Sequence, residues 1–357
     1  MAKLRVGVIF GGRSGEHEVS IASAASIFKH LDPARYDPVP IRIEKDGRWV
    51  LTGAAPTAIS AAEVLQQAPA AALQPVEPTA AVSRSGVDVV FPVLHGPYGE
   101  DGTVQGLLEL ANVPYVGCGV LASAAGMDKA VMKVLFAARG LPVGPYVTAL
   151  RSEWHRDAAA VTRRIEDELR YPVFVKPANL GSSVGISKAK TRDEFEAAMR
   201  LALDFDRKIV IEAAVPEARE IECSVLGNDD PEASVPGEVI PSREFYDYEA
   251  KYIDAASQTL IPASLTDEQA ATIRRMAIEA FRAVDGAGMA RVDFLMARAT
   301  GAIVVNEVNT IPGFTTISMY PKMWDASGLA YSALLDRLIA LALERHAEKQ
   351  RLKTSIT

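Results

Sequence analysis

The sequence predicts an α/β and α+β fold, in which an N-terminal domain with a doubly wound parallel sheet precedes smaller mixed units. An apolar run from Val6 to Phe10 breaks into glycines and continues into a helical segment from Val19 to His30. This order of strand, glycine turn and helix is how doubly wound domains begin. A second buried strand is expected from Val87 to Val93. The chain of 357 residues also exceeds the roughly 250–300 residues at which a single core stops growing.

The later elements alternate without the regularity of one parallel sheet. Helices are expected over Met127 to Arg139 and after the capping pairs Thr191 with Glu194 and Thr266 with Gln269. Strands are expected over Val173 to Lys176, Ile209 to Glu212, Arg291 to Met296 and Ile303 to Asn309. The Ala- and Pro-rich segment 53–81 is expected to form short helix and loop on the surface. We therefore predict three domains, over residues 1–123, 124–215 and 216–357.

Charge and composition exclude several classes of protein. The formal net charge of -7 argues against a nucleic-acid surface, which requires clustered Lys and Arg. No segment approaches the roughly 18 uninterrupted apolar residues of a membrane span, and the N-terminal apolar run is too short for a signal peptide. The only cysteines, Cys118 and Cys223, lack metal-site spacing and are expected to be buried thiols. We expect a cytoplasmic protein that binds neither nucleic acid nor membrane.

Two strand-like runs near the C-terminus carry the strongest chemical pattern. Arg291 and Asp293 share one strand face, and Glu307 and Asn309 share a face of the next strand. A hairpin between these strands brings all four side chains to one surface. Two carboxylates and an amide oxygen suit Mg²⁺, whose coordination is completed by water and phosphate oxygens. The simpler alternative is a pair of exposed strand faces with ordinary polar residues.

A lysine and a loop of small residues suggest a phosphate site. Lys176 ends an apolar strand, and the loop from Asn179 to Gly185 follows it directly. Small residues let backbone N–H groups and hydroxyls approach a phosphate, and the lysine adds a point charge. The Walker pattern is absent, so this is not a P-loop. A flexible hairpin with a solvated lysine would give the same pattern.

The first glycine loop argues against dinucleotide and zinc chemistry. It lacks GxGxxG, and Glu16 and Glu18 would repel a pyrophosphate, so NAD binding is not expected. His17 has no second histidine at the spacing of a zinc protease. Glu16 instead suits an ammonium group of a substrate, or a helix N-terminus. The aromatic and charged run from Tyr246 to Tyr252 is expected to be a loop, and a lid over the site is one reading of it.

In their order and spacing, these segments resemble the D-alanine:D-alanine ligase family over almost the whole chain. The matching segments are Gly11 to Ser20, His95 to Gly102, Lys176 to Gly185, Tyr246 to Tyr252 and Glu307 to Gly313. The resemblance implies a three-domain ATP-grasp fold. It also implies that ATP is a co-substrate, that two Mg²⁺ or Mn²⁺ ions bind per site, and that the chain is a homodimer.

The resemblance also implies roles for individual residues. Asp293, Glu307 and Asn309 match metal ligands, and Lys129, Lys176 and Lys251 match residues that contact ATP phosphates. Glu212, Ala213 and Val215 match the adenine-binding strand end, and Glu220 matches the ribose-binding residue. Many relatives have lysine where this chain has Ala213, which removes one side-chain contact with the base.

The same resemblance places the two amino-acid substrates. Glu16, with Ser182 and Tyr252, matches the group that binds the ammonium of the first D-alanine, with His95 nearby. Ser318 and Met319 match the positions that hold the carboxylate of the second D-alanine. Arg291 and the backbone of Gly313 match the groups that stabilise the tetrahedral intermediate. Relatives that use a hydroxy acid as acceptor often have phenylalanine at the position of Tyr252, so the tyrosine favours D-alanine.

Three other functions compete with this interpretation. A different ATP-grasp ligase, acting on a longer peptide or a hydroxy acid, would share the nucleotide half of the site. A non-catalytic nucleotide-binding protein would need no complete set of Asp293, Glu307, Asn309, Lys176 and Arg291, which this chain has. A dinucleotide oxidoreductase would need the fingerprint that the first loop lacks.

Overall fold

A computed structural model describes residues 2–51, 54–58, 60–66, 75–83, 85–240, 258–353 and 355 of the chain. Its N-terminal sheet has the strand order β4 (Pro75–Val76), β3 (Trp49–Leu51), β2 (Tyr36–Ile43), β1 (Leu4–Gly11) and β5 (Val89–Val93). Strand β1 pairs in parallel with both β2 and β5, and β3 and β4 add antiparallel strands at one edge. The alanine- and proline-rich segment therefore contributes an edge strand in addition to the expected short helix.

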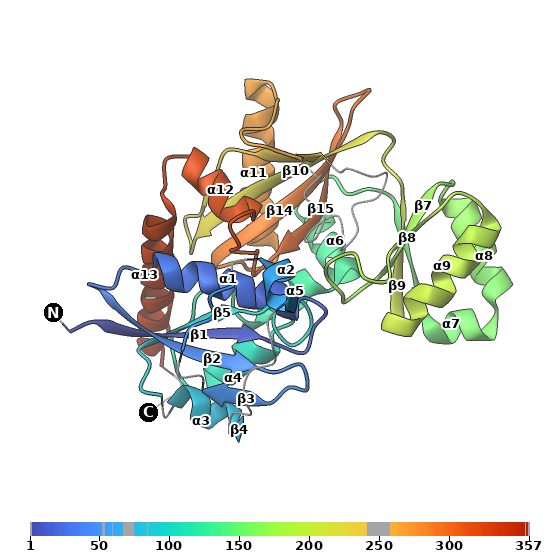
Figure 1. Cartoon of the computed structure of the whole chain (residues 1–357). Coiled ribbons are helices and arrows are strands. Elements are labelled where there is room, and N and C mark those ends of the chain that lie inside the picture. The colour runs from blue at the N-terminus through green and yellow to red at the C-terminus, as the bar shows by residue number, and fades with distance from the viewer. Residues whose placement is uncertain are drawn as a thin grey trace.

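Helices cover both faces of this sheet (Figure 1). On one face, Val6, Val8 and Phe10 of β1 pack into a core with α1 (His17–His30) and the C-terminal helix α13 (Tyr331–Gln350). On the other face, Ile9 packs into a core with α3 (Pro78–Ser83) and α4 (Thr103–Leu110). Helix α2 (Ala61–Gln66) lies beside α1. The prediction of a doubly wound N-terminal domain is confirmed, because alternate residues of β1 face opposite cores.

The central sheet is antiparallel, in the order β6 (Tyr146–Leu150), β9 (Lys208–Ala213), β7 (Val173–Pro177) and β8 (Ser187–Ala189). Helices α7 (Arg151–Arg156), α8 (Ala158–Glu168) and α9 (Arg192–Phe205) pack on one face, around the buried ring of Phe195. Figure 1 shows these helices on the outer side of the molecule, so the opposite face of the sheet is turned toward the third sheet.

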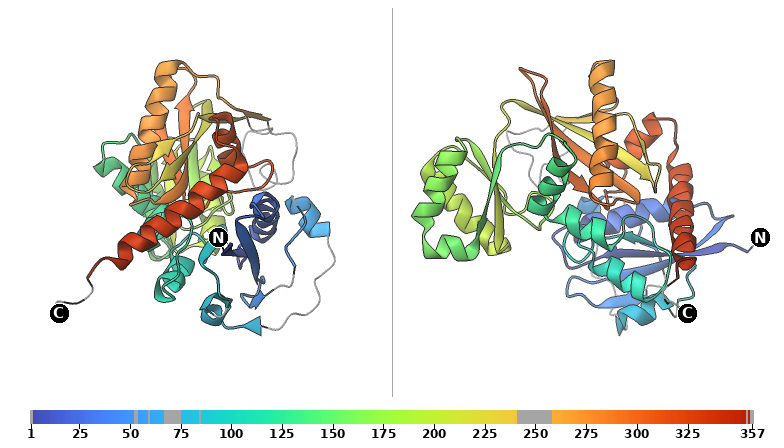
Figure 2. Two further views of the ribbon diagram at one scale, coloured as in Figure 1. Left: turned by 90° about the vertical axis from the view of Figure 1, so that its left-hand side faces the viewer. Right: turned by 180° about the vertical axis from the view of Figure 1, so that it is seen from behind.

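The third sheet has the order β13 (Gln258–Leu260), β12 (Gly237–Ile240), β10 (Ala218–Gly227), β14 (Gly288–Ala297) and β15 (Ile303–Asn309), with β11 (Glu232–Ala233) beside β10. Helix α11 (Asp267–Ala283), orange in Figure 2, packs against it. Helices α5 (Val120–Met127) and α6 (Lys129–Ala138) pack on β15, and α12 (Met319–Ala326) packs on β10. Three sheets with their own cores are the arrangement expected of an ATP-grasp fold.

The predicted strands and both capping threonines are confirmed, but one helix boundary was wrong. The segment from Met127 to Arg139 does not form one helix, because Asp128 has an extended backbone and separates α5 from α6. The Asp128 carboxylate accepts hydrogen bonds from the backbone N–H groups of Ala130 and Val131, which makes it the N-cap of α6. Cys118 and Cys223 are free and buried, as predicted.

Membrane-crossing helices were sought among the described residues. No single helix there is long and apolar enough to span a membrane. Only α12 and α13 taken together reach the required length and composition, and they are bent by 106° relative to each other.

Candidate active site

Glu16 lies where three loops meet, directly before α1. The hydroxyl of Ser182, in the loop after β7, donates a hydrogen bond to the Glu16 carboxylate. A Cβ atom on either Gly96 or Gly181 would lie 3.0 Å from Oε2 of Glu16, which is closer than an ordinary contact, so glycine favours the close approach of both loops. Only 7% of Glu16 is exposed. The first loop and the loop after β5 therefore meet at Glu16, and the loop after β7 joins them.

The backbone of the loop after β7 is strained where it meets Glu16. Ser182 and Ser183 have φ angles of 51° and 60°, in the left-handed region that non-glycine residues seldom adopt. Such strain persists only where surrounding contacts hold it, and it is found often at ligand sites. The hydrogen bond to Glu16 is one of those contacts.

His95 and Glu100 tie the second loop to the turn after β15. The buried His95 donates from Nδ1 to the carbonyl of Ile311 at 3.0 Å, and its Nε2 lies 3.4 Å from the hydroxyl of Ser23. Burial lowers the pKa of His95, so the ring is neutral at pH 7. Glu100 accepts hydrogen bonds from the backbone N–H groups of Gly96 at 2.8 Å and Ile311 at 3.1 Å. Burial and the nearby carboxylate of Glu16 raise the pKa of Glu100 to about 8.

The turn before α12 brings Gly313 against Ser318. A Cβ atom at Gly313 would lie 2.8 Å from the Ser318 hydroxyl oxygen, which in turn accepts a hydrogen bond from the backbone N–H of Thr315 at 3.0 Å. Ser318 is the N-cap of α12, so the first backbone N–H groups of this helix point out of its end. The side chain of Met319 is buried and packs with Val239 and Met323.

The predicted hairpin of β14 and β15 is confirmed. Arg291 lies opposite Asn309, and Asp293 lies opposite Glu307. The Arg291 guanidinium donates through Nε and Nη2 to both carboxylate oxygens of Asp293, each at 2.7 Å. The amide of Asn309 donates to the same carboxylate at 3.0 Å. A second carboxylate, that of Glu222 on β10, lies 3.0 Å from Nε of Arg291.

A bulge in β15 changes the direction of Asn306. Pairing shifts between Asp293 and Phe294, so Asn306 has no partner in the ladder. Its Oδ1 lies 3.5 Å from the ammonium of Lys176, on the central sheet. The bulge therefore connects the hairpin to the lysine that the sequence assigns to phosphate.

The lysines lie between the central and third sheets. Lys129, the first residue of α6, donates to the carbonyl of Leu180 at 2.8 Å and lies 3.5 Å from the Glu307 carboxylate. Lys176 on β7 pairs with Glu212 on β9 at 2.8 Å, because the antiparallel register brings these strands together. Burial alone would raise the pKa of Glu212, but the adjacent ammonium groups lower it to about 2.

The remaining predicted residues are spread along this boundary. Ala213 ends β9, Val215 follows it, and Glu220 lies on β10 opposite Leu295 of β14. Lys251 and Tyr252 lie outside the described residues. Glu100 and Lys133 also lie in this region and were not predicted from the sequence, although Glu100 belongs to the same glycine-rich loop as His95.

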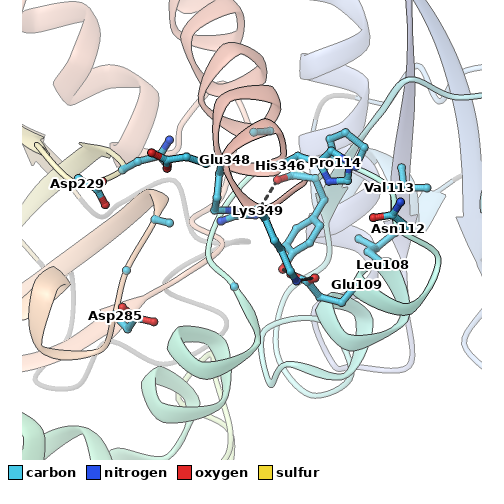
Figure 3. Close-up of a pocket in the computed structure, with 17 residues that line it drawn as sticks. Leu108, Glu109, Asn112, Val113, Pro114, Asp229, Asp285, His346, Glu348 and Lys349 are labelled. Carbon is cyan, nitrogen blue, oxygen red and sulfur yellow. Dashed lines mark hydrogen bonds and ion pairs between the residues drawn. The ribbon is translucent and has the colours of Figure 1, made fainter. Parts of the chain in front are cut away.

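The cavity in Figure 3 lies elsewhere, where the end of α13 meets α4 and the loop after it. Its volume is about 230 Å³, and its lining carries charges of both signs. Lys349 pairs with Glu109, and Arg345 donates to the carbonyls of Gly117 and Tyr115. These contacts fasten the C-terminal helix to the N-terminal domain. None of the predicted site residues lines this cavity.

Comparison with known proteins identifies the family of the chain. Residues 5–118 match the D-ala D-ala ligase N-terminus family, and residues 135–340 match the D-ala D-ala ligase C-terminus family. The chain belongs to the D-alanine–D-alanine ligase family. A D-alanine–D-alanine ligase of Geobacillus thermodenitrificans is 53% identical, with 98% of each chain covered.

Two solved structures are similar to this member of the ligase family. The D-alanine-D-alanine ligase of Coxiella burnetii is 38% identical, with a TM-score of 0.80 over 98% of this chain and 97% of that one. The VanG D-Ala:D-Ser ligase of Enterococcus faecalis is 37% identical, with a TM-score of 0.82 over 96% of this chain and all of that one. The predicted ATP-grasp fold is thereby confirmed.

Members of this ligase family use ATP and a divalent metal ion. Among the residues that the structure describes, no group of three or more His, Cys, Asp and Glu side chains has the geometry of a metal site. The predicted set is of another kind, with the two carboxylates of Asp293 and Glu307 and the amide oxygen of Asn309. Hard oxygen donors of this sort fit Mg²⁺ or Mn²⁺ when phosphate oxygens and water complete the shell.

Proposed function

We propose that this chain joins two D-alanine molecules into D-alanyl-D-alanine for peptidoglycan synthesis, converting one ATP into ADP and phosphate. The observation that carries the proposal is that Glu100, whose carboxylate joins the loop beside Glu16 to the turn before Gly313, lies within the electrostatic reach of both Glu16 and Arg291 of the β14–β15 hairpin. The full-length family match supports the same conclusion. This ligation needs a group that binds the substrate ammonium, a backbone donor that stabilises the tetrahedral intermediate, and a site for the nucleotide and its metal ions.

The reaction has two chemical steps. A carboxylate oxygen of the first D-alanine attacks the γ-phosphorus of ATP, which breaks the bond to ADP and forms D-alanyl phosphate. The amine of the second D-alanine then attacks the acyl carbon, and phosphate leaves as the peptide bond forms. Activation is required because a carboxylate oxygen is a poor leaving group.

Glu16 binds the ammonium group of the first D-alanine. Its carboxylate is buried and held by Ser182, so it presents a fixed negative charge beside the loops at Gly96 and Gly181. Tyr252 completes this group in the proposal. Neutral His95 carries no charge that would repel the ammonium, and its hydrogen bond to Ile311 fixes the turn that precedes Gly313.

The second D-alanine binds at the start of α12. The Ser318 hydroxyl and the backbone N–H of Met319 hold its carboxylate, since the positive end of a helix dipole attracts an anion. The Met319 side chain is packed in a core and takes no part. Arg291 and the backbone N–H of Gly313 stabilise the tetrahedral intermediate, and Asp293 and Glu222 fix the guanidinium for that task.

ATP binds between the central and third sheets. Lys129, Lys176 and Lys251 contact its phosphates, and Glu220 contacts the ribose. Glu212, Ala213 and Val215, at the end of β9, bind adenine through a carboxylate and backbone groups. Asp293, Glu307 and Asn309 hold two Mg²⁺ or Mn²⁺ ions, which supply charge neutralisation at the transferred phosphoryl group when they are bound.

Oxygen transfer tests the acyl phosphate directly. D-Alanine labelled with ¹⁸O in its carboxylate is incubated with ATP and Mg²⁺, and the released phosphate is analysed by mass. The proposal predicts one ¹⁸O atom per phosphate, because the attacking carboxylate oxygen leaves with the phosphoryl group. Unlabelled phosphate formed together with the dipeptide would contradict the proposed intermediate.

The homodimer implied by the resemblance also remains a proposal, and one surface supports it. Every exposed residue between positions 103 and 138, across α4, α5 and α6, is uncharged. Leu110, Val120, Leu121, Val131 and Val134 are large apolar members of this set. An extended apolar face marks an association site, and a second copy that carries the same uncharged face is a matching partner.

The proposal also includes three domains, with boundaries near residues 123 and 215, and a cytoplasmic location. The first boundary falls within α5, beside the helices that pack on the third sheet, and the second follows β9 of the central sheet. ATP as co-substrate supports a cytoplasmic location.

A further inference from the structure

Lys133 on α6 is a buried lysine to which neither substrate nor metal has been assigned. Only 2% of the residue is exposed. Its ammonium lies 3.1 Å from Oε1 of Glu212, and the ammonium of Lys176 lies 2.8 Å from Oε2 of the same carboxylate. Each oxygen of Glu212 therefore has its own lysine.

Burying two ammonium groups beside one carboxylate is unfavourable, because one positive charge is removed from water without a carboxylate of its own. A single Lys–Glu pair would cancel, whereas this trio has one positive charge in excess. Only 6% of Glu212 and 9% of Lys176 are exposed. Burial lowers the pKa of Lys133, and the charge of Lys176 acts in the same direction against the attraction of Glu212. The next carboxylate that acts on Lys133, that of Glu307, is itself paired with Lys129.

The position of the trio indicates what the excess charge is for. Lys176 also lies 3.5 Å from Asn306, on the hairpin that carries the proposed metal ligands. Lys133 lies on the other side of Glu212, near the ring of Tyr146 at 5.7 Å, and is almost inaccessible to solvent. Lys133 therefore acts through Glu212, and Lys176 is the member closer to the proposed phosphates.

We propose that Lys133 is a positioning residue of the nucleotide site, which neutralises Glu212 so that the charge of Lys176 remains available to the phosphates of ATP. The inference rests on the proposed function, because it needs a nucleotide at this boundary. Without Lys133, Glu212 and Lys176 would form a neutral pair, and the attraction of Lys176 for phosphate would weaken. Lys133 also holds the Glu212 carboxylate in place for adenine. Each carboxylate oxygen keeps a second lone pair, which can accept a hydrogen bond from the base.

The test compares the binding of ADP and adenosine, which differ in the phosphates. Binding is measured by calorimetry with Mg²⁺ for the full-length protein and for Lys133→Met. ADP is expected to bind about 10-fold more weakly to the variant, while the affinity for adenosine changes less than about threefold. The exposed Lys190 provides the matched control Lys190→Met, which is expected to leave both affinities unchanged.

A second variant separates charge from packing. In the double variant Lys133→Met with Glu212→Gln, the negative charge is removed as well, so Lys176 regains its free charge. Because Glu212 also belongs to the proposed adenine-binding group, the variants are compared by the ratio of ADP affinity to adenosine affinity, in which a lost contact with the base cancels. In the double variant this ratio is expected to recover to within about threefold of the parent protein. In the single variant Glu212→Gln, which keeps both lysines, the same ratio is expected to be at least that of the parent, and this test holds even if Lys133→Met does not fold.

The outcomes are distinguishable. Equal losses of ADP and adenosine affinity in Lys133→Met would overturn the inference, since a packing defect acts on both ligands. Failure of the ratio of ADP to adenosine affinity to recover in the double variant would also overturn it. A parent protein that binds neither ligand would instead reject the proposed nucleotide site, and with it the function on which the inference rests.

Discussion

Removing the Ser182 hydroxyl is expected to lower kcat/KM for D-alanine without a comparable change in the KM for ATP. This hydroxyl donates to the carboxylate of Glu16, which is buried. Hydrogen bonds to charged groups contribute about 1.5–3 kcal/mol. That range corresponds to a loss of roughly 10- to 150-fold in kcat/KM for D-alanine in Ser182→Ala, at about 1.4 kcal/mol for each factor of ten.

The assay is the initial rate of phosphate release as D-alanine and ATP are varied separately. The KM for ATP is expected to change less than about threefold, because Lys176 and Glu212 lie on other strands of the site. Ser187→Ala, on β8 of the same sheet, provides the matched control and is expected to behave as the parent does. A D-alanine effect below threefold, or an equal effect on ATP, would refute the assignment of Ser182.

Three further predictions concern stability and assembly. The pKa of Glu212 is lowered from 4.5 to about 2, so its stabilisation is complete above about pH 5 and is lost as the pH falls toward 2. At about 1.4 kcal/mol per unit of pKa shift, this stabilisation amounts to about 3 kcal/mol. The urea midpoint of the parent should therefore exceed that of Glu212→Gln by less in acid than at neutral pH, and a difference that stays constant with pH would contradict the prediction. Gly11→Ala should lower the free energy of unfolding by about 2 kcal/mol or more, because φ is +94° and the new Cβ would lie 2.2 Å from a backbone carbonyl oxygen. The control is Gly15→Ala, whose Cβ would meet nothing within 4 Å, and equal denaturation midpoints for the two variants would exclude this strain. Leu121→Glu should give a monomer by light scattering while Leu201→Glu, exposed on α9, does not, and an unchanged mass for both would reject the proposed dimer face.

The sequence predicted the elements whose side-chain periodicity is strong. Arg291 with Asp293 and Glu307 with Asn309 follow strand alternation, and these two neighbouring runs predicted the hairpin that the structure contains. The bulge that releases Asn306 from this ladder has no such signal, because it depends on how the two strands are packed. The start of α6 was predictable in principle, since aspartate is a favoured N-cap and Asp128 precedes the helix.

Long-range contacts set the limit of the sequence analysis. The joining of Lys176, Lys133 and Glu212 depends on the register of β7 and β9 and on how α6 packs beside them. A lysine in a helix usually reaches solvent, so nothing local marks Lys133 as buried. Glu100 was missed for the same reason, because its partner Ile311 lies 211 residues away in the chain.

The most direct test of the central claim is phosphate release from ATP and Mg²⁺ with D-alanine, with L-alanine, and with D-alanine mixed with D-lactate or D-serine, each product being identified by mass. The proposed function predicts release with D-alanine alone and a product with the mass of D-alanyl-D-alanine. Release only in the presence of D-lactate or D-serine would keep the ATP chemistry and contradict the assignment of D-alanine as acceptor.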